Sequence, residues 1–379
     1  ERKWTHDAAS SFAVDLNNHI GEAPAPHYDS PYAAFSEFLS SEMLDLIIMQ
    51  SNTYAIQKGR QVLFTREKVL CSLGFLFFSG YHNLPQRRLY WEKADDVNVQ
   101  FTSNHLRRCE FENFLANLHL ADNSQINEDR YYKVRPIFDI ANKNFSKVPL
   151  SQRLCVDEHI VRYYGRHSTK KFIRGKPIRY GYELFGIASP NGFLHYVEPS
   201  CGSSTRLFDS GLGHGPNIVL SLVEKAKVLD HSDIYFDNRF TTLPLLDELS
   251  RRSLGGTGTL RENFSHGIPL EPKSVVEKSD RGHCNIVSCE NIEIVRWKDN
   301  RSVTIASNCH HTFPIRKVER WSAKNKKIVS IDCPNVIVQY NRFMGGCDLH
   351  DQYHYMYEIP IRMKKWWWPL CKWIFIHVS

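Results

Sequence analysis

Residues 154–166 read LCVDEHIVRYYGR, and the rest of the chain is organised around them. Apolar and polar residues alternate at the start of this stretch, which predicts a strand with Asp157 in its middle. A carboxylate in apolar surroundings recurs in IYFDNRF, which holds Asp237, and in NRFMGGCDLHDQ, which holds Asp348 and Asp351. An isolated buried carboxylate costs several kcal/mol unless it is paired or binds a metal ion. Three such stretches in one chain therefore indicate one metal site that the fold assembles.

The composition is that of a globular protein long enough for two or more domains. The 379 residues are 42% hydrophobic and carry a net charge of +7. This positive charge favours nucleic acid as a partner. Ten cysteines are scattered without a disulfide framework, as in a reducing compartment. No stretch predicts a signal peptide or a membrane span, because the apolar end at 366–378 is too short and contains Lys372. Since the sequence begins at Glu1 and stops inside a helical pattern, we expect a fragment.

The first part of the chain is predicted to be mostly helical. Residues 1–29 are polar and mixed, and we expect them to be loosely ordered. Ser30 and Pro31 form a helix start, and apolar residues follow at helical spacing. Further helices are expected at 65–79, 104–120 and 134–144.

The pattern changes to an alternating α/β one at Leu154. A strand, a hairpin around the turn at 189–192, a helix at 217–226, the strand DIYFDN, a helix at 243–252 and a short strand at 254–260 follow in order. Residues 262–335 break this order with short alternating runs, which predict a small antiparallel insertion. The core then resumes at 336–340, and a helix after Gly345 and Gly346 carries Asp348 and Asp351.

Several short sequence motifs resemble those of the piggyBac transposases and of the host proteins derived from them. They are VDEHIVRYYGR, FDNRFTTLPLLDEL, GTGTLREN and YNRFMGGCDLHDQ, and the resemblance runs from about Ser30 to Trp368. It implies an α/β fold with an RNase H-like catalytic core of the DDD transposase type, a β-rich insertion and a helical dimerisation and DNA-binding domain. The words SNTYA, LPQRRLYW and LHLADN resemble that helical domain. The expected divisions are 1–153 (helical), 154–261 (core), 262–335 (insertion), 336–351 (core) and 352–379 (return to the helical domain).

The resemblance also assigns the acidic residues. The family's three catalytic aspartates match Asp157, Asp237 and Asp348, and a further aspartate of its motif matches Asp351. Magnesium or manganese suits these hard oxygen ligands, and two ions about 4 Å apart can serve both the attacking and the leaving oxygen of a phosphodiester. Glu158 is excluded from the metal set, because adjacent residues of a strand point to opposite sides. Taken singly, Asp348 and Asp351 are equally explained as helix-cap or first-turn residues.

Basic and aromatic residues follow the first aspartate closely. Cations at this density neutralise phosphates and aromatic rings stack on unpaired bases, whereas the alternative is a solvated hairpin face. Arg239 and Arg261 are expected near the same sheet edge. The resemblance implies that a tryptophan of KKWWWP lies close to DNA near the active site, although those tryptophans could equally pack a domain junction. The candidate DNA-binding residues are Arg162, Arg166, Lys170, Lys171, Arg174, Lys176, Arg239, Arg261, Lys364, Lys365 and Trp366.

The insertion contains cysteines and histidines that are possible ligands of a second metal site. Cys284 and Cys289 have a spacing found in zinc sites, and Cys309, His310 and His311 follow, but no second clean pair exists. We interpret these residues as packing residues and do not expect zinc here. Two departures from the family also stand out: no C-terminal cysteine-rich zinc domain occurs before Ser379, and Cys347 stands where the family usually has valine.

Two functions remain open on the sequence. The first is a cut-and-paste DNA transposase of the nucleus, and the resemblance implies TTAA target sites, hairpin intermediates, binding to transposon ends and a homodimer. The second is a domesticated, catalytically inactive DNA-binding protein that keeps the fold. The complete set of aspartates favours the first, while the missing zinc domain leaves the second open. An unrelated metal-dependent nuclease is disfavoured by the flanking words.

Overall fold

The structure, a computed structural model, describes residues 2–378 apart from 10, 20–23, 25, 177, 266 and 324. Its first part is helical, as predicted, and Ser30, Ser40 and Thr65 cap the first three α-helices through their side chains. The helices are α1 (Pro31–Phe38), α2 (Ser41–Gln57), α3 (Arg66–Tyr81), α4 (Gln100–His105), α5 (Arg108–Asn117) and α6 (Arg135–Phe145).

The helix predicted at 104–120 is present but shorter, as α5 (Arg108–Asn117). The chain breaks between α4 and α5 at Leu106, whose backbone is extended and whose side chain is buried. The Trp91 indole N–H donates to the Leu106 carbonyl at 2.6 Å. This contact satisfies a carbonyl that a continuous helix would have used internally, so tertiary packing overrides the local helical pattern.

The catalytic-core prediction is confirmed as a mixed sheet in the RNase H-like order. β1 pairs antiparallel with β3 and parallel with β5, β5 pairs parallel with β6, and β4 lies antiparallel to β3. The elements are β1 (Arg153–Arg162), β2 (Lys171–Phe172), β3 (Tyr180–Ala188), β4 (Leu194–Pro199), α7 (His214–Ala226), β5 (Asp233–Phe236), α8 (Leu243–Arg251) and β6 (Gly255–Thr259). Leu154 and Val156 of β1 pack in one core with α7 and α8, whereas Cys155 and Val161 face the core that contains the helical part.

The insertion continues the core sheet instead of forming a separate one. Its strand β9 hydrogen-bonds to β6, and the order β6-β9-β8-β7 extends the sheet to nine strands. A second, two-stranded sheet projects from it. The elements are α9 (Lys273–Val276), β7 (Cys284–Cys289), β8 (Ile292–Lys298), β9 (Ser302–Ser307), β10 (Arg316–Ser322) and β11 (Lys327–Cys333).

Described residues near the chain start contact the insertion, whereas part of the segment expected to be loosely ordered (1, 10, 20–23 and 25) lies outside the described residues. Thr5 forms a β-bridge with Ser288 of β7, and the Ala9 N–H donates to Glu293. The chain start therefore covers part of an edge strand that would otherwise expose its hydrogen-bonding groups.

Three helices close the structure: α10 (Asn335–Phe343), α11 (Gly346–Met356) and α12 (Trp368–His377). The chain thus returns to the core at 336–340 as a helix, and α11 lies against β1 and β3. Trp367 and Trp368 are buried in the same core as the helical part, so these two tryptophans pack a junction, while Trp366 is half-buried. Among the described helices, none combines the length and the apolar character needed to cross a bilayer.

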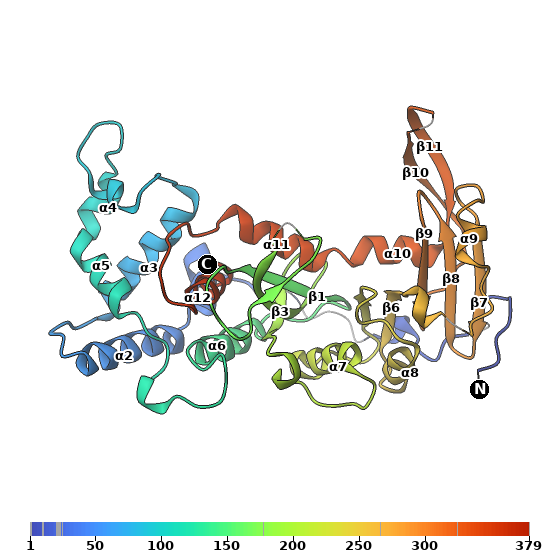
Figure 1. Ribbon diagram of the computed structural model, residues 1–379, viewed down its shortest axis with the longest axis horizontal. Helices are drawn as coiled ribbons and strands as arrows, with labels where there is room; N and C mark the ends of the chain where they lie inside the picture. The colour runs from blue at the N-terminus through green and yellow to red at the C-terminus, as the bar shows by residue number, and fades with distance from the viewer. Residues whose placement is uncertain are drawn as a thin grey trace.

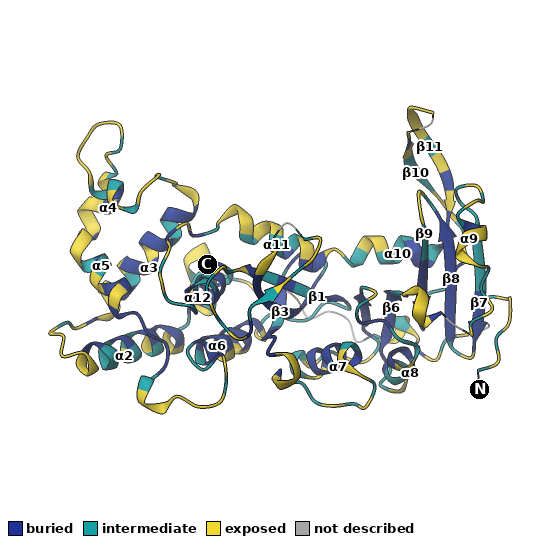
Figure 2. Cartoon of the chain, in the orientation of Figure 1, coloured by how far each residue is buried: buried dark blue, intermediate teal, exposed yellow. Residues whose placement is uncertain are grey.

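The molecule is elongated, with two raised ends. Helices α3, α4 and α5 rise at one end and the β10–β11 hairpin rises at the other, while α10 and α11 run between them above the sheet (Figure 1). Burial concentrates in the central strands and α6, whereas α4 and the β10–β11 hairpin are largely exposed (Figure 2).

The close packing of α11 on the sheet gives a stability prediction. A Cβ added at Gly346 would lie 2.4 Å from the Ser189 carbonyl oxygen and 2.8 Å from Cys155 Sγ, whereas one at Gly345 would meet nothing within 4 Å. We expect Gly346→Ala to lower the free energy of unfolding by about 1–3 kcal/mol, because backbone atoms must move. Gly345→Ala is the matched control and should change it by less than about 1 kcal/mol. Denaturant unfolding of the two variants measures both, and equal effects would contradict this packing.

Candidate metal centre and DNA-facing surface

Two of the predicted aspartates meet because β1 and β5 are parallel neighbours. Val156 pairs with Phe236, so Asp157 and Asp237, the next residue of each segment, lie beside one another where β5 ends. The chain turns at Asp237, whose Oδ1 accepts a hydrogen bond from the Arg239 backbone N–H at 2.8 Å. Carboxylate oxygens of Asp157, Glu158 and Asp237 all lie within 4.8 Å of one another. We call these three residues the acidic group.

The expectation that Glu158 points away from the other carboxylates is wrong. Its side chain does start on the opposite face of β1, where its cross-strand neighbour is the buried Phe185. β5, however, ends at Phe236 and leaves the edge of β1 open beside Glu158. A long side chain at an open edge can turn back toward the other face, which alternation alone does not predict.

The acidic group carries more negative charge than the neighbouring cations compensate, as the pKa values of its members indicate. Burial, followed by the neighbouring carboxylates of Glu158 and Asp237, raises the pKa of Asp157. Burial also raises the pKa of Asp237. Although burial acts against it, the hydrogen bond from Lys176 keeps the pKa of Glu158 below its ordinary value. Glu158 Oε2 is buried without a hydrogen-bond partner among the described residues.

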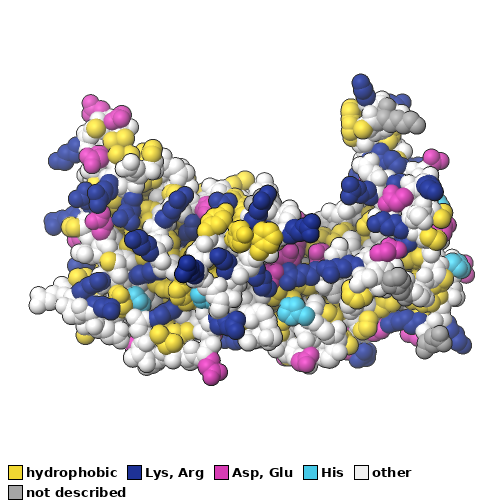
Figure 3. Space-filling view, in the orientation of Figure 1, with side chains coloured by type: hydrophobic (Ala, Val, Ile, Leu, Met, Phe, Trp, Pro, Cys, Tyr) yellow, Lys and Arg dark blue, Asp and Glu magenta, His cyan; other side chains and the backbone are white. Residues whose placement is uncertain are grey.

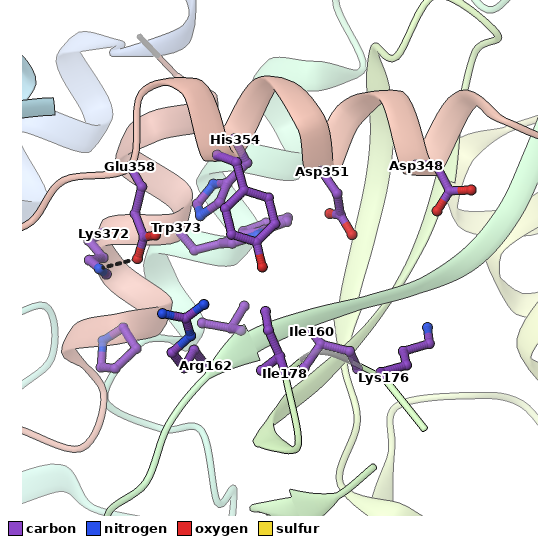
Figure 4. Close-up of a pocket in the computed structure, with 13 residues that line it drawn as sticks. Ile160, Arg162, Lys176, Ile178, Asp348, Asp351, His354, Glu358, Lys372 and Trp373 are labelled. Atoms are coloured by element: carbon purple, nitrogen blue, oxygen red, sulfur yellow. Dashed lines mark hydrogen bonds and ion pairs between the residues drawn. The ribbon is translucent and has the colours of Figure 1, made fainter. Parts of the chain in front are cut away.

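Asp348 reaches the same region from α11. With Asp351 it lines a cavity of about 330 Å³, into which both carboxylates point from the helix while Lys176 lies on the facing wall (Figure 4). Lys176 Nζ donates to Glu158 Oε1 at 2.7 Å, so the cavity adjoins the acidic group. Burial and then the charges of Asp237, Asp157 and Asp348 raise the pKa of Tyr340 to about 12. The charges of all three aspartates therefore act on one hydroxyl, although Asp348 is not among the residues within 4.8 Å of each other.

Asp351 has a partner that the sequence did not suggest. The ring nitrogen Nδ1 of the buried His159 lies 2.7 Å from Asp351 Oδ1. His159 has room because Gly186 lies under its ring, where a Cβ would come within 2.5 Å of Nε2. Although burial acts to raise it, the charge and hydrogen bond of His159 lower the pKa of Asp351. No side chain caps α11, so neither aspartate serves as its N-cap.

Several of the predicted DNA-binding cations are engaged inside the protein. Arg239 Nη1 donates to Glu183 Oε1 at 2.6 Å and lies 3.6 Å from Glu158 Oε2. Lys171 also bonds to Glu183. Lys365 donates to carbonyl oxygens at the end of α5, including that of Leu118 at 2.7 Å. These three cations therefore form intramolecular contacts that stabilise the fold.

Other predicted cations are open to solvent, and the exposed ones are Arg162, Arg166, Arg174, Arg261 and Lys364. Lys170 is half-buried, with its ammonium 5.5 Å from the centre of the Tyr180 ring. Trp366 stacks on His167 with a ring separation of 4.1 Å. Lys and Arg side chains form a band across the middle of the molecule, between its two raised ends (Figure 3).

The comparison with known proteins identifies the family. The sequence profile of the family described as Transposase IS4 matches residues 30–378. The human piggyBac transposable element-derived protein 3 is 36% identical over 359 residues. This chain belongs to the piggyBac transposase family. The human piggyBac transposable element-derived protein 2 is 32% identical over 346 residues and aligns with 89% of the chain. Membership implies dependence on a divalent metal, for which the acidic group is the candidate site.

A solved structure shares the fold. A piggyBac transposase, determined by cryo-EM in a synaptic complex with hairpin DNA, superposes with a TM-score of 0.78 at 20% identity, over 94% of this chain and 75% of that one. The match with the derived protein 3 covers 92% of this chain and 60% of the relative, and that with protein 2 covers 58% of the relative. The chain therefore spans about three-fifths of the length of these relatives.

Removing the charge of Asp157 should make metal-free protein more stable at high pH. A carboxyl whose pKa is raised by folding stabilises the folded state below its unfolded pKa of about 3.9, and this contribution is lost as pH rises toward the folded pKa. The raised pKa of Asp157 thus weakens the wild type, but not Asp157→Asn, between about pH 5 and about pH 8. We expect the stability advantage of the variant in EDTA to grow by about 1 kcal/mol or more over this range.

Thermal unfolding at both pH values measures this difference. The exposed Asp95→Asn serves as the control and should follow the wild type. Added Mg²⁺ should then stabilise the wild type more than Asp157→Asn, because it binds only the folded protein. A stability difference that does not change with pH would contradict the proposed burial of an unpaired charge.

Proposed function

We propose that this chain is the catalytic part of a DNA transposase that cuts and joins strands with divalent metal ions. One observation carries the proposal: the carboxylates of Asp157, Glu158 and Asp237 meet at the end of β5, beside the cavity into which Asp348 and Asp351 point. Scaffolds of this family use such carboxylates for phosphodiester chemistry, and the lack of compensating charge explains why a cation would be favoured there.

The residues present fit magnesium or manganese. All five candidate ligands are carboxylates, the hard oxygen donors that these ions prefer. Burial, and after it repulsion from neighbouring carboxylates, raises the pKa values of Asp157 and Asp237, and a bound cation would offset both effects. We assign Asp157, Asp237 and Asp348 as ligands, Glu158 as an additional one, and Asp351 as a fifth that His159 orients. Two ions there would stabilise charge on both the attacking and the leaving oxygen of the phosphodiester.

The chain's own residues prepare this site. Arg239 and Lys176 offset part of the negative charge of the acidic group, and Glu183 in turn fixes Arg239. The Tyr340 hydroxyl, on which the charges of the three aspartates act, remains protonated over the working pH range, because burial and those charges raise its pKa to about 12. It is thus a donor that can orient a phosphate oxygen.

We place DNA in the hollow between the two raised ends, along the exposed cations beside the acidic group. Double-stranded transposon ends and TTAA target DNA are the proposed substrates, in the nucleus and with a homodimer as the active form. The proposed divisions are a helical DNA-binding and dimerisation part at 1–153 and 352–379, a core at 154–261 and 336–351, and the insertion at 262–335. The relative of the same fold was determined in a complex with hairpin DNA, which supports DNA as the substrate.

A domesticated DNA-binding protein is the second candidate. Both human relatives carry names that describe them as derived from a transposable element. Retention of the fold and of the basic surface suits either function. The acidic group favours the enzyme, because clustered carboxylates without a metal cost stability and repel DNA.

Cleavage by the acidic-group variants separates the two candidates. With Mg²⁺ or Mn²⁺, Asp157→Asn, Asp237→Asn and Asp348→Asn should each lower strand cleavage by several orders of magnitude while leaving binding of terminal DNA intact. Double variants should be little worse than single ones, because the ligands act as one unit. Glu158→Gln should lose at least about tenfold. The assay follows nicking of labelled transposon-end DNA by the whole protein that contains this chain.

Asp230→Asn is the matched control, since Asp230 is exposed just before β5, and it should cleave like the wild type. If the whole wild-type protein binds its own terminal DNA but never nicks it with either metal, the domesticated binding protein is the correct function. Wild-type activity in Asp157→Asn would instead remove the acidic group from the chemistry.

The salt dependence of DNA binding tests the exposed cations. The exposed pair Arg166 and Arg174 should contact phosphates, so Arg166→Gln with Arg174→Gln should reduce the slope of log K against log salt by about 2. Lys171→Gln is the internal control: Lys171 already bonds to Glu183 and to Ser200 at 2.9 Å, so its loss should leave the slope unchanged. Titrations at several salt concentrations give the slopes, and an unchanged slope in the double variant would make the segment a solvated face.

A further inference from the structure

A second group of potential metal ligands lies at the other end of β5. Asp233 is the first residue of β5, and Cys309 and His310 follow β9 after one intervening residue, Asn308. Their ligand atoms lie within 4.8 Å of one another. Cys309 Sγ is 3.5 Å from Asp233 Oδ1, and His310 Nε2 is 2.6 Å from Asp233 Oδ2. A carboxylate, a thiol and an imidazole therefore converge on one point.

The fold makes this convergence tight. β5 pairs parallel with β6 and β9 pairs antiparallel with it. The start of β5 and the end of β9 therefore lie at the same end of the sheet. Gly255, the first residue of β6, leaves room for the Cys309 side chain, because a Cβ atom at position 255 would lie 2.8 Å from Cys309 Sγ. The Asp233 side chain is inaccessible to solvent, whereas the His310 side chain is 13% exposed. The group is thus buried but has a side open to solvent.

The charges of the group suit a cation. The His310 charge and hydrogen bond keep the pKa of the buried Asp233 below its usual value, although burial acts to raise it. Burial and the Asp233 charge raise the pKa of the Cys309 thiol well above normal. Two hydroxyls, of Ser307 and Thr257, lie 3.6 Å and 3.7 Å from the same sulfur. A sulfur that faces a carboxylate and is flanked by hydroxyls would ionise only if a positive ion lay between them.

We propose that Asp233, Cys309 and His310 bind one Zn²⁺ ion that fastens the insertion to the catalytic core. Zinc is the ion whose ligands include nitrogen, sulfur and carboxylate oxygen together, whereas magnesium takes oxygen alone. The fourth, tetrahedral position falls to water on the solvent side of His310, with the Tyr235 hydroxyl, 3.1 Å from His310 Nε2, as its neighbour. Ser307 and Thr257 act as outer partners that steady the thiolate.

This site differs from the one that cysteine spacing suggested. Cys284 and Cys289 lie on β7, and neither belongs to a described group of converging ligands. His311 turns to Glu293 instead, with Nδ1 3.4 Å from Oε2. Cys309 and His310 combine with an aspartate 76 residues earlier in the chain, a partner that spacing could not reveal.

Cobalt provides the direct test. The 379-residue chain, stripped with EDTA and reduced, is titrated with Co²⁺ alone and then with Zn²⁺. We expect a thiolate-to-cobalt absorption band that saturates at one thiolate-bound Co²⁺ per chain, apart from any Co²⁺ at the acidic group, and that one equivalent of Zn²⁺ removes. Cys309→Ser should abolish the band and weaken binding at least about 100-fold, and Asp233→Asn should weaken it similarly.

Three controls fix the location of the ion. Cys289→Ser alters a buried cysteine of β7 and should keep the band. Asp157→Asn should also keep it, which separates this ion from those of the acidic group. Tyr235→Phe should bind nearly as well as the wild type.

The proposal fails if the wild type shows no thiolate band, or if Cys309→Ser binds Co²⁺ like the wild type. In either case the group is a buried Asp233–His310 pair without metal. The wild-type titration decides this even if a variant does not fold.

Discussion

The parallel pairing of β1 with β5 is the interaction on which the rest of this structure depends. Its register places Val156 against Phe236, and so sets Asp157 and Asp237 side by side just where β5 ends. Strands with this relation require a crossover, which here runs through the β3–β4 hairpin and α7. Helix α11 packs on the same strand through Gly346 and Cys347, whose sulfur lies 3.4 Å from that of Cys155. Asp348 and Asp351, which line the cavity, are thereby brought next to Asp157 and Asp237 at the end of β5.

The acidic group illustrates how a fold tolerates charges that oppose its stability. Lys176 and Arg239 offset part of the repulsion, and Glu183 holds Arg239 in place from a buried position on β3. The compensation is incomplete, since the pKa of Asp157 stays raised and one oxygen of Glu158 has no described hydrogen-bond partner. Incomplete compensation of this kind is what a site for dications needs, because a fully paired cluster would have no remaining charge to bind them.

The insertion is mechanically part of the core. Because β9 pairs with β6, the sheet runs unbroken from the hairpin β3–β4 to β7, and the N-terminal segment joins its far edge at Ser288. One short strand, β5, consequently links two sites: the acidic group follows its last residue, and Asp233 of the proposed zinc site is its first. An ion at that second site would fix the end of the strand opposite to the chemistry.

The sequence by itself determined the order of strands and helices, the family, and the approach of Asp157 to Asp237. Aspartates inside apolar strands carry a local signal, because burial of an unpaired carboxylate is too costly to be accidental. Tertiary structure alone decided the place of Glu158, the pairing of His159 with Asp351, the break of the helix at Leu106 and the meeting of Asp233 with Cys309 and His310. Alternation along a strand specifies a face but not whether a neighbouring strand covers the edge, and spacing says nothing about residues that approach across a sheet. Those contacts depend on register and packing, which arise only when distant segments come together.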